Sequence, residues 1–587
     1  MNQKILVGVA WPYVNGDLHL GHLAGYLLPA DMFARFQRLR GNDVLMISGS
    51  DCHGTPITVE ADKSGKTPAE IVKTYHQQDI ELFKLYDLSY NLYTDTTTEQ
   101  HMTTVQEMFL DLLKSGYIVK DTMQQYYAEA DQQFLPDRYV EGTCPHCGAH
   151  EQRSDQCEAC GRWLADGELL NPISKLTKAA VSLKATEHYF LDFEKITPQL
   201  REYVDSRKGI WRNWVWQETN SWLTEGLKKR AITRDMDWAI DLPIEEIKKL
   251  PADKQLKDFT GKKIYVWFEA VIGYLSAVKQ WSTITSADNI PDNVIYSKTS
   301  GQATDWKEWW LNKDARIFNF MGQDNLVFHT LMWPAQLIGT GKDYTLPENV
   351  VVNKFLNLEG KKFSKSRNWT INSRKMAETF STDLVRYYMV SNFPENKEGD
   401  FTWQGFVASV NNELVANLGN FINRSLKFYE AKLSGKLTSN EYVLDKHIEQ
   451  RIKDTFINCA AHLDKVELVA GFNQIMELSR FGNKYFDDEK IWVVVKTDTA
   501  KAEQIMFNLL NIVNAFKLIM IPFLPNAAKQ LAETLGSDIE ISAYSPDVNH
   551  DLWQPEITKS FKLIKDVTIL FNKLDLTEVL SIKESLR

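Results

Sequence analysis

The sequence predicts an α/β protein with a Rossmann-type parallel sheet, split by an insertion and followed by an all-α helical domain. Three observations lead to this prediction. Strand and helix patterns alternate over residues 1–50, the same alternation returns at 263–280 and 316–339, and amphipathic helices dominate from about residue 373. Alternating strands and helices favour a parallel sheet covered by helices, and a run of helices favours a separate helical layer.

The opening of the chain shows the pattern most clearly. Residues 5–10 are apolar and β-prone, and 11–18 contain the Pro, Asn and Gly that are typical of a loop. A helix is expected over 19–40, ending at Gly41, and a second buried strand over 43–48. A strand–helix–strand start indicates a parallel sheet with right-handed crossovers.

The middle of the chain predicts an interruption of the sheet. Helices are expected near 68–87 and 98–115, short strands follow, helical periodicity runs from 173 to 230, and 349–370 suggest a β-hairpin and loop. We predict that the two halves of the sheet cover residues 1–115 and 231–348, separated by an insertion at 116–230. A loop region at 349–390, a helical domain at 391–545 and a tail at 546–587 follow.

Composition narrows the class of protein. The chain has 587 residues, so several domains are expected at roughly 100–200 residues each. A net charge of −10 argues against a surface coated with nucleic acid, although a local patch could still bind one. The apolar start is too short for a signal peptide, and no run approaches the ~18 apolar residues of a membrane span. We therefore expect a cytoplasmic protein without a membrane partner.

A histidine pair marks the start of the first expected helix, where residues 19–22 read His-Leu-Gly-His. His19 and His22 share a helix face, and the first turn offers unpaired N–H groups and the positive end of the helix dipole. Gly21 leaves room for a ligand to approach the backbone. The pattern predicts a phosphate site, although two histidines at this spacing also occur by chance in structural helices.

A basic loop follows the second half of the sheet, where residues 362–366 read Lys-Phe-Ser-Lys-Ser after Gly360. Lys362 and Lys365, among small hydroxyl residues, could form a cationic clamp that stabilises the charge of a leaving pyrophosphate. A basic surface turn is the alternative.

Four of the six cysteines lie close together as CxxC…CxxC: Cys144, Cys147, Cys157 and Cys160. Four thiolates can close a tetrahedral zinc site, which leaves no open coordination position and is therefore structural. His146 and His150 are expected to be spectators. A disulfide pair or free thiols are the alternative.

Together, the histidine pair and the basic loop resemble the HIGH and KMSKS motifs of class I aminoacyl-tRNA synthetases. In that family the histidines contact the ATP phosphates and the second loop lysine steadies the transition state, which implies these roles for His19, His22 and Lys365. Several further stretches are similar to methionyl-tRNA synthetases in particular: AWPYVNG at 10–16, GTP at 54–56, VWFEA at 266–270 and NFMGQD at 319–324 with His329.

This resemblance implies a methionine–tRNA ligase, which uses Mg²⁺-bound ATP to form methionyl-adenylate and then loads tRNA(Met). Polarizable sulfur packs well against aromatic rings, and a carboxylate can pair with the α-amino group. The methionine site is expected at Ala10, Trp11, Tyr13, Asp51, Trp267, Ala270, Tyr274 and His329. The ATP site is expected at His19, Gly21, His22, Gly322, Asp324 and Lys365. Three departures from the family are Cys52, Val271 and Phe363.

The helical half contains a candidate anticodon site. Asn420 and Arg424 lie four apart on one helix face and could read a base edge, and Trp492 could stack on an unstacked base. In the family, matching positions recognise the CAU anticodon. Without the resemblance, a solvated helix face and a core tryptophan would be the simpler interpretation.

Three competing functions remain at this point: a synthetase for another amino acid, a small nucleotidyltransferase, and a non-catalytic tRNA-binding protein. The insertion of about 115 residues is too small for the editing domain of the leucine, isoleucine and valine enzymes. The helical half argues against a small nucleotidyltransferase, and the intact histidines and lysines argue against a decayed enzyme. We expect a monomer.

Overall fold

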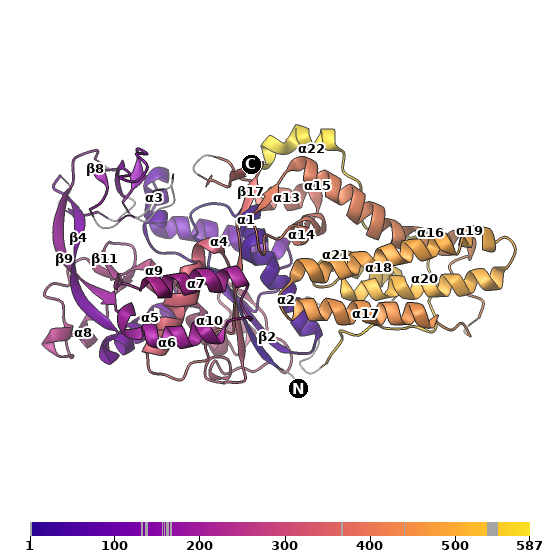
Figure 1. The fold of residues 1–587 in the computed structure, drawn as a ribbon, viewed down its shortest axis with the longest axis horizontal. Helices are drawn as coiled ribbons and strands as arrows, with labels where there is room; N and C mark the ends of the chain where they lie inside the picture. Colours follow the sequence, from indigo (N-terminus) through magenta and orange to yellow (C-terminus); the bar gives the residue numbers. More distant parts are fainter. Residues whose placement is uncertain are drawn as a thin grey trace.

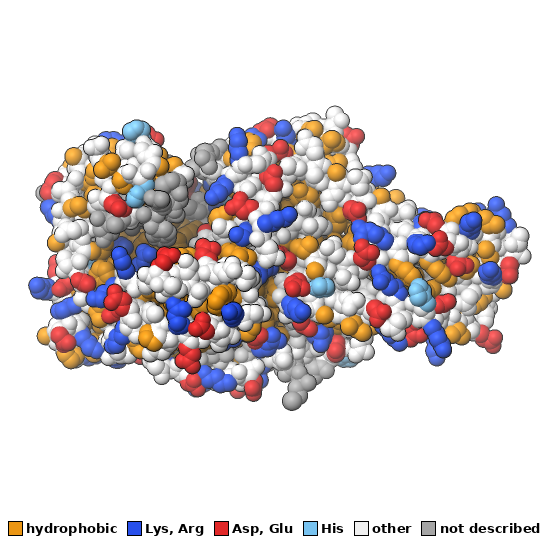
Figure 2. Space-filling model, viewed as in Figure 1, with side chains coloured by type: hydrophobic (Ala, Val, Ile, Leu, Met, Phe, Trp, Pro, Cys, Tyr) orange, Lys and Arg blue, Asp and Glu red, His pale blue; other side chains and the backbone are white. Residues whose placement is uncertain are grey.

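The computed structural model describes residues 3–587 except for 131–132, 136–138, 155–156, 158, 160–163, 165–166, 176, 366–367, 440 and 537–549. A broad part contains the sheets, and a narrower bundle of helices extends from one side of it (Figure 1). On the face shown in Figure 2, acidic and basic side chains are interspersed over both parts. The predicted α/β class with a following helical domain is confirmed.

The main sheet has six strands in the order β14-β3-β2-β1-β15-β16. All neighbours are parallel except β14, which runs antiparallel to β3. The chain moves outward from β1 to β3 and then returns to β15 on the other side of β1, and ligands bind at such a switch point. The strands are β1 Lys4–Val9, β2 Asp43–Ser50, β3 Leu92–Asp95, β14 Ile295–Tyr296, β15 Arg316–Gly322 and β16 Asn349–Asn353.

The helix expected over 19–40 forms as one continuous element with a wider turn near its start. It comprises α1 (Leu20–His22), the π-helical η1 (Leu23–Leu27) and α2 (Leu28–Leu39). Gly41 follows with φ of 73°, a conformation that glycine adopts without strain. The next two expected helices are α4 (Pro68–Leu85), capped by Thr67 and Glu70, and α5 (Glu99–Ser115).

The insertion is built on a long antiparallel pair, β4 (Ile118–Ala128) and β9 (Ser182–Leu191). The helical periodicity expected from residue 173 was therefore wrong over β9, because pairing with β4 along its whole length overrides a local pattern. Helices α6 (Phe193–Ser206) and α7 (Asn213–Glu225) follow. A smaller sheet of β6 (Val140–Thr143), β7 (Gln152–Arg153) and β8 (Leu170–Ser174) borders the cysteines.

A short strand and two helices precede the second half of the main sheet. After β13 (Lys262–Ile264), the chain forms α9 (Val266–Glu269) and α10 (Gly273–Thr283). The hairpin expected over 349–370 is shorter than that range, because its first strand joins the main sheet as β16. The hairpin itself is β17 (Leu356–Leu358) with β18 (Lys361–Lys362).

The helical bundle begins after α14 (Thr382–Ser391) and is anchored to the sheet by one buried arginine. Arg386 donates to Asp31 on α2, at 2.7 Å, and to the carbonyl oxygens of Pro522 and Phe523 in the turn between α20 and α21. The bundle elements are α15 Trp403–Ser409, η9 Val410–Gly419, α16 Asn420–Lys432, α17 Lys446–Leu463, α18 Leu468–Asp488, α19 Ile491–Val494, α20 Thr499–Ile519 and α21 Pro525–Thr534.

The end of the chain returns to the sheet-bearing part. Helix α22 (Leu576–Ile582) lies beside α15, and the Leu586 carbonyl oxygen accepts from the backbone N–H of Asn372. The tail expected over 546–587 is thus partly helical and packed near the basic loop. Within the described residues, no helix is both long and apolar enough to cross a membrane.

Candidate active site and metal centre

The His-Leu-Gly-His motif caps the helix that follows β1. The Nδ1 atom of His19 accepts from the Gly21 N–H at 3.1 Å, and that of His22 accepts from the His19 N–H at 3.0 Å. A nitrogen that accepts carries no proton, so each ring keeps its hydrogen on Nε2, which can donate to a phosphate oxygen. Burial and the neighbouring Lys365 lower the pKa of His22 to about 3, and burial is also the main cause that lowers the pKa of His19.

The basic loop lies directly against this helix start. The Phe363 ring stacks on the His19 ring, with centroids 4.8 Å apart and planes 12° from parallel. Lys365 donates from Nζ to the carbonyl oxygen of Gly16 at 2.9 Å. Loss of hydration lowers the pKa of Lys365, and this ammonium in turn acts on His22. The two motifs, far apart in the sequence, therefore form one site.

The first lysine of the loop lies differently from the second. Lys362 is exposed on β18, where its ammonium sits over the Phe355 ring, 5.3 Å from the centroid. Lys365 thus hydrogen-bonds the segment that leads to the histidines, whereas the ammonium of Lys362 lies over Phe355.

The end of β15 lies against the histidine-bearing helix, where the sequence predicts the rest of the ATP site. A Cβ built on Gly25 would lie 4.0 Å from the Gly322 Cα, so the histidine-bearing helix packs closely on this strand end. Asp324 follows in a short 3₁₀ turn, and burial raises the pKa of its carboxyl group against the opposing backbone hydrogen bonds. Gly322, Asp324 and Gly21 thus lie around the same helix and strand ends.

Aromatic side chains form one wall of the expected methionine pocket. Trp267 stacks on Phe328 with ring centroids 4.4 Å apart, and Tyr13 meets the Trp267 ring edge-on at 6.2 Å. The sequence did not single out Phe328, although it directly precedes His329. Aromatic edges and faces of this kind suit a thioether side chain.

Trp11 forms a second wall because two glycines make space for it. A Cβ on Gly49 would lie 2.2 Å from the Trp11 ring, and one on Gly273 would lie 2.7 Å away. Ala10 is buried beside it and Ala270 is half-buried at the start of a 3₁₀ turn. Glycine at positions 49 and 273 is therefore required by the packing of the indole.

Tyr274 and His329 form a neutral hydrogen-bonded pair. The Nδ1–H of His329 donates to the carbonyl oxygen of Asn325 at 2.8 Å, so its Nε2 accepts from the Tyr274 hydroxyl at 2.7 Å. Burial lowers the pKa of His329 to about 4. An uncharged pair of this kind is suited to an apolar ligand.

Asp51 directly follows β2 and forms a backbone bridge with Tyr13. Its side chain is buried, and its Oδ1 atom has no hydrogen-bond partner among the described residues. Desolvation, followed by the charge of Glu269, raises the pKa of Asp51 well above its ordinary value. A buried carboxylate oxygen without a partner is costly and favours a bound cation.

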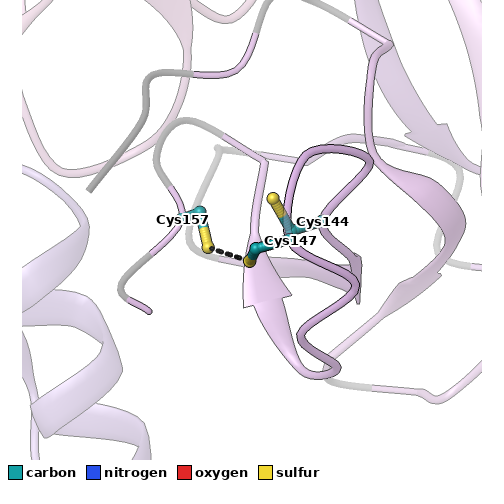
Figure 3. Close-up of side chains that lie close together, drawn as sticks. All are labelled: Cys144, Cys147 and Cys157. Atoms are coloured by element: carbon teal, nitrogen blue, oxygen red, sulfur yellow. Dashed lines mark hydrogen bonds between the residues drawn. The ribbon is translucent and has the colours of Figure 1, made fainter. Parts of the chain in front are cut away.

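Three cysteines cluster in the insertion (Figure 3). The sulfurs of Cys144, Cys147 and Cys157 all lie within 4.8 Å of one another, and Cys147 and Cys157 are 3.6 Å apart. Tetrahedral zinc with Zn–S bonds of about 2.3 Å separates its sulfurs by about 3.8 Å, so the three thiols fit a metal ion. Cys160, the fourth predicted ligand, lies outside the described residues.

The two histidines near the cluster have other neighbours. His146 lies 3.8 Å from the Glu168 carboxylate, and His150 hydrogen-bonds the Thr143 hydroxyl at 3.0 Å. Neither belongs to the cluster that could hold a metal ion within the described part of the chain.

Two of the three candidate anticodon residues, Arg424 and Trp492, contact the Phe486 ring of the helical bundle. Arg424 lies over the Phe486 ring and pairs with Asp487 at 2.9 Å, and the Trp492 ring stacks on Phe486 with centroids 5.9 Å apart. Asn420 hydrogen-bonds Asn483 at 3.4 Å. Trp492 is 42% exposed, so it is not the core residue of the simpler interpretation.

Comparison with known proteins agrees with this architecture. A family model described as "tRNA synthetases class I (M)" matches residues 5–426, and one described as "Anticodon binding domain of methionyl tRNA ligase" matches 433–584. The methionine–tRNA ligase of Roseiflexus sp. (strain RS-1) is 40% identical over 98% of this chain and 97% of its own length. That of Thermomicrobium roseum is 39% identical over 98% and 97%.

The fold also matches a solved structure. Mycobacterium tuberculosis methionyl-tRNA synthetase, in complex with methionyl-adenylate, superposes with a TM-score of 0.74 at 20% identity, covering 97% of this chain and 100% of that one. With the two family models and the full-length relatives, the assignment is complete: this chain belongs to the methionyl class I tRNA synthetases.

Proposed function

We propose that the protein activates L-methionine with ATP to methionyl-adenylate and pyrophosphate, and then transfers methionine to the 3′ end of tRNA(Met). The observation that carries this proposal is the contact of the Lys365 loop with the His19 and His22 helix start, beside an aromatic pocket that contains an unpaired Asp51 oxygen.

The phosphate end would act through hydrogen bonds and one cation. His19 and His22 would donate from Nε2 to phosphate oxygens, and Lys365 would leave the Gly16 carbonyl to follow the charge on the departing pyrophosphate. Asp324 would bind the ribose, and Gly21 and Gly322 would let the nucleotide approach the backbone. Mg²⁺ would arrive with ATP. Lys362 would contribute less than Lys365 to stabilising the pyrophosphate charge, because it is exposed on β18.

The methionine end would act through shape and pairing. Asp51 would pair with the ammonium group, and the Tyr274–His329 pair would face the thioether. The remaining members of the proposed pocket are Ala10, Trp11, Tyr13, Trp267 and Ala270, to which the contacts add Phe328. Holding the methionine carboxylate near the α-phosphate would supply most of the rate enhancement, without a covalent nucleophile.

Two further sites belong to the proposal. One structural Zn²⁺ would be held by Cys144, Cys147, Cys157 and Cys160. Asn420, Arg424 and Trp492 would read the anticodon, Trp492 by stacking. The domain division inferred from the sequence, the monomeric state and the cytoplasmic location stay predictions.

The decisive experiment is ATP–pyrophosphate exchange with each of the twenty amino acids. We expect exchange with methionine and at least about 100-fold less with leucine or isoleucine, because branched side chains do not fit a pocket shaped for a straight thioether. Equal exchange with another amino acid would show a different synthetase, and tRNA binding without any exchange would show a non-catalytic protein.

The anticodon role is tested separately. Trp492→Ala should lower the kcat/KM of aminoacylation for tRNA(Met) by about 10- to 100-fold, since stacking on one base contributes about 1–3 kcal/mol. Methionine-dependent exchange should not change, because it does not involve tRNA. Loss of both activities would show that Trp492 only supports the fold.

A further inference from the structure

A buried carboxylate lies within the methionine pocket's own framework. Glu269 has no exposed surface and stands between Trp267 and Ala270 in the sequence. Its two oxygens face two imidazoles, the Nδ1 atom of His53 at 3.0 Å and the Nε2 atom of His101 at 2.7 Å. Burial alone would raise the pKa of Glu269, but the two histidines outweigh it and hold that pKa below its ordinary value. Glu269 is therefore a buried anion.

His101 approaches this anion from helix α5. Its Nδ1 atom lies 2.8 Å from the Ser276 hydroxyl oxygen, and that hydroxyl donates to the Gly273 carbonyl oxygen at 3.2 Å. His101 therefore links the Glu269 carboxylate on α9 to Ser276 on α10. The His101 ring also lies 6.2 Å from the Trp11 ring.

His53 connects the same anion to the Asp51 turn. It lies two residues after Asp51, and its ring is 6.0 Å from that of Trp238. Trp238 in turn donates from Nε1 to the carbonyl oxygen of Cys52 at 2.7 Å. The His53–Glu269–His101 triad thus joins the end of β2, helix α5 and helix α9 at one buried point.

The triad also reaches Asp51 electrostatically. The charge of Glu269 is one of the causes that raise the pKa of Asp51, after desolvation. The Oδ1 atom of Asp51 has no partner among the described residues, so a cationic group that binds there would lie near two buried carboxylates. An ammonium group bound there would be stabilised by the two carboxylates and would favour their ionised forms.

We propose that Glu269 is a positioning residue for the ammonium group of the amino-acid substrate. With His53 and His101 it holds the Asp51 turn and the Trp11 wall in place, and it adds a second negative charge to the ammonium site. This inference rests on the proposed function, in which Asp51 pairs with that ammonium group.

The test is Glu269→Gln in methionine-dependent ATP–pyrophosphate exchange. The amide keeps the shape of the side chain but removes the charge and turns a donor towards an imidazole N–H. We expect the KM for methionine to rise by about tenfold or more, while kcat and the KM for ATP stay within about threefold of wild type. Glu269→Asp, which keeps the charge on a shorter arm, should recover part of the loss.

Two matched variants separate this role from a general effect on folding. Glu503→Gln removes another buried carboxylate, which accepts from Thr438 and Tyr442 in the helical bundle, and should leave the KM for methionine unchanged. Ser276→Ala removes the partner of His101 and should raise the KM for methionine by about two- to fivefold without unfolding the protein.

The outcomes are distinct. A Glu269→Gln enzyme whose KM for methionine stays within about twofold of wild type would overturn the proposal, as would equal increases in KM for methionine and ATP. If Glu269→Gln does not fold, an unchanged KM in Ser276→Ala overturns it instead. Failure of the proposed function would appear earlier, as a wild-type protein without methionine-dependent exchange.

Discussion

The two ends of the proposed active site, the phosphate end and the methionine end, are built in different ways. At the phosphate end, His19, His22 and Lys365 hydrogen-bond to backbone atoms, which orients them and leaves each with a donor for a ligand. At the methionine end, buried side chains hydrogen-bond one another, as Tyr274 and His329 do. Their polar groups are therefore satisfied, and a ligand would be recognised mainly by the shape of the pocket.

This difference follows from what each end has to recognise. The negative charge on the phosphate oxygens changes during the reaction. Hydrogen-bond donors that bind these oxygens more strongly in the transition state therefore raise the rate of the chemical step. A thioether does not change, so a preformed pocket affects binding of the substrate and its transition state equally. Substitutions at the two ends should therefore alter different kinetic constants.

The largest effect is expected from Lys365→Ala at the phosphate end. The variant loses the cation that meets the charge of the leaving pyrophosphate, so kcat for ATP–pyrophosphate exchange should fall by about 100- to 1,000-fold. The KM for methionine should stay within about threefold. Lys362→Ala is the matched control and should lose much less. An equal fall in kcat in the two variants would show that Lys362 and Lys365 contribute equally to the exchange reaction.

A smaller effect of the opposite kind is expected from Tyr274→Phe. The ring remains, but the Nε2 atom of His329 loses its donor, and an unsatisfied buried group costs about 1–3 kcal/mol. The KM for methionine should rise by about five- to tenfold and kcat should stay nearly constant, measured by exchange at varied methionine. A fall in kcat with unchanged KM would contradict the contrast between the two ends.

Cys147→Ser probes a site that belongs to neither end. Removing one of the thiols should lower bound zinc from about one ion per chain and lower the melting temperature by several degrees. Exchange kinetics should change by less than about threefold. Elemental analysis and calorimetry on the same samples measure both quantities. Wild-type protein that holds no metal after purification in zinc-containing buffer would contradict the zinc assignment.

The smallest expected effect is a pH dependence of stability at His22. Its pKa in the folded protein is about 3, below the ordinary value of 6.5, because burial and Lys365 disfavour the charged ring. Above pH 6.5 neither state binds the proton, but below it only the unfolded chain does, so stability falls on acidification. Between pH 7 and pH 5, the melting temperature of His22→Asn should therefore fall by less than that of wild type.

Exposed His447→Asn is the control for that measurement. If wild type and His22→Asn lose the same melting temperature between pH 7 and pH 5, His22 is not buried against a cation in solution. The phosphate end would then be more open than the contacts of Lys365 and Phe363 indicate.

Local signals were sufficient for several parts of the fold. The helix that starts at His19 and ends at Gly41 follows from a cap, an apolar face and a glycine, which act within one or two turns. The strand β9 did not follow in this way, because its pairing with β4 crosses more than fifty residues of sequence and local periodicity does not report it.

The sequence by itself determined which chemical groups are present: a histidine pair at a helix start, a lysine loop, a CxxC pair and an aromatic set whose order resembles one family. Only the tertiary structure decided which of them meet. The strand order brings the Lys365 loop to His19, lets Phe328 cover Trp267, and encloses Glu269 between two histidines. The reason is physical, since a buried charge is stable only beside its partners, and those partners lie on different elements.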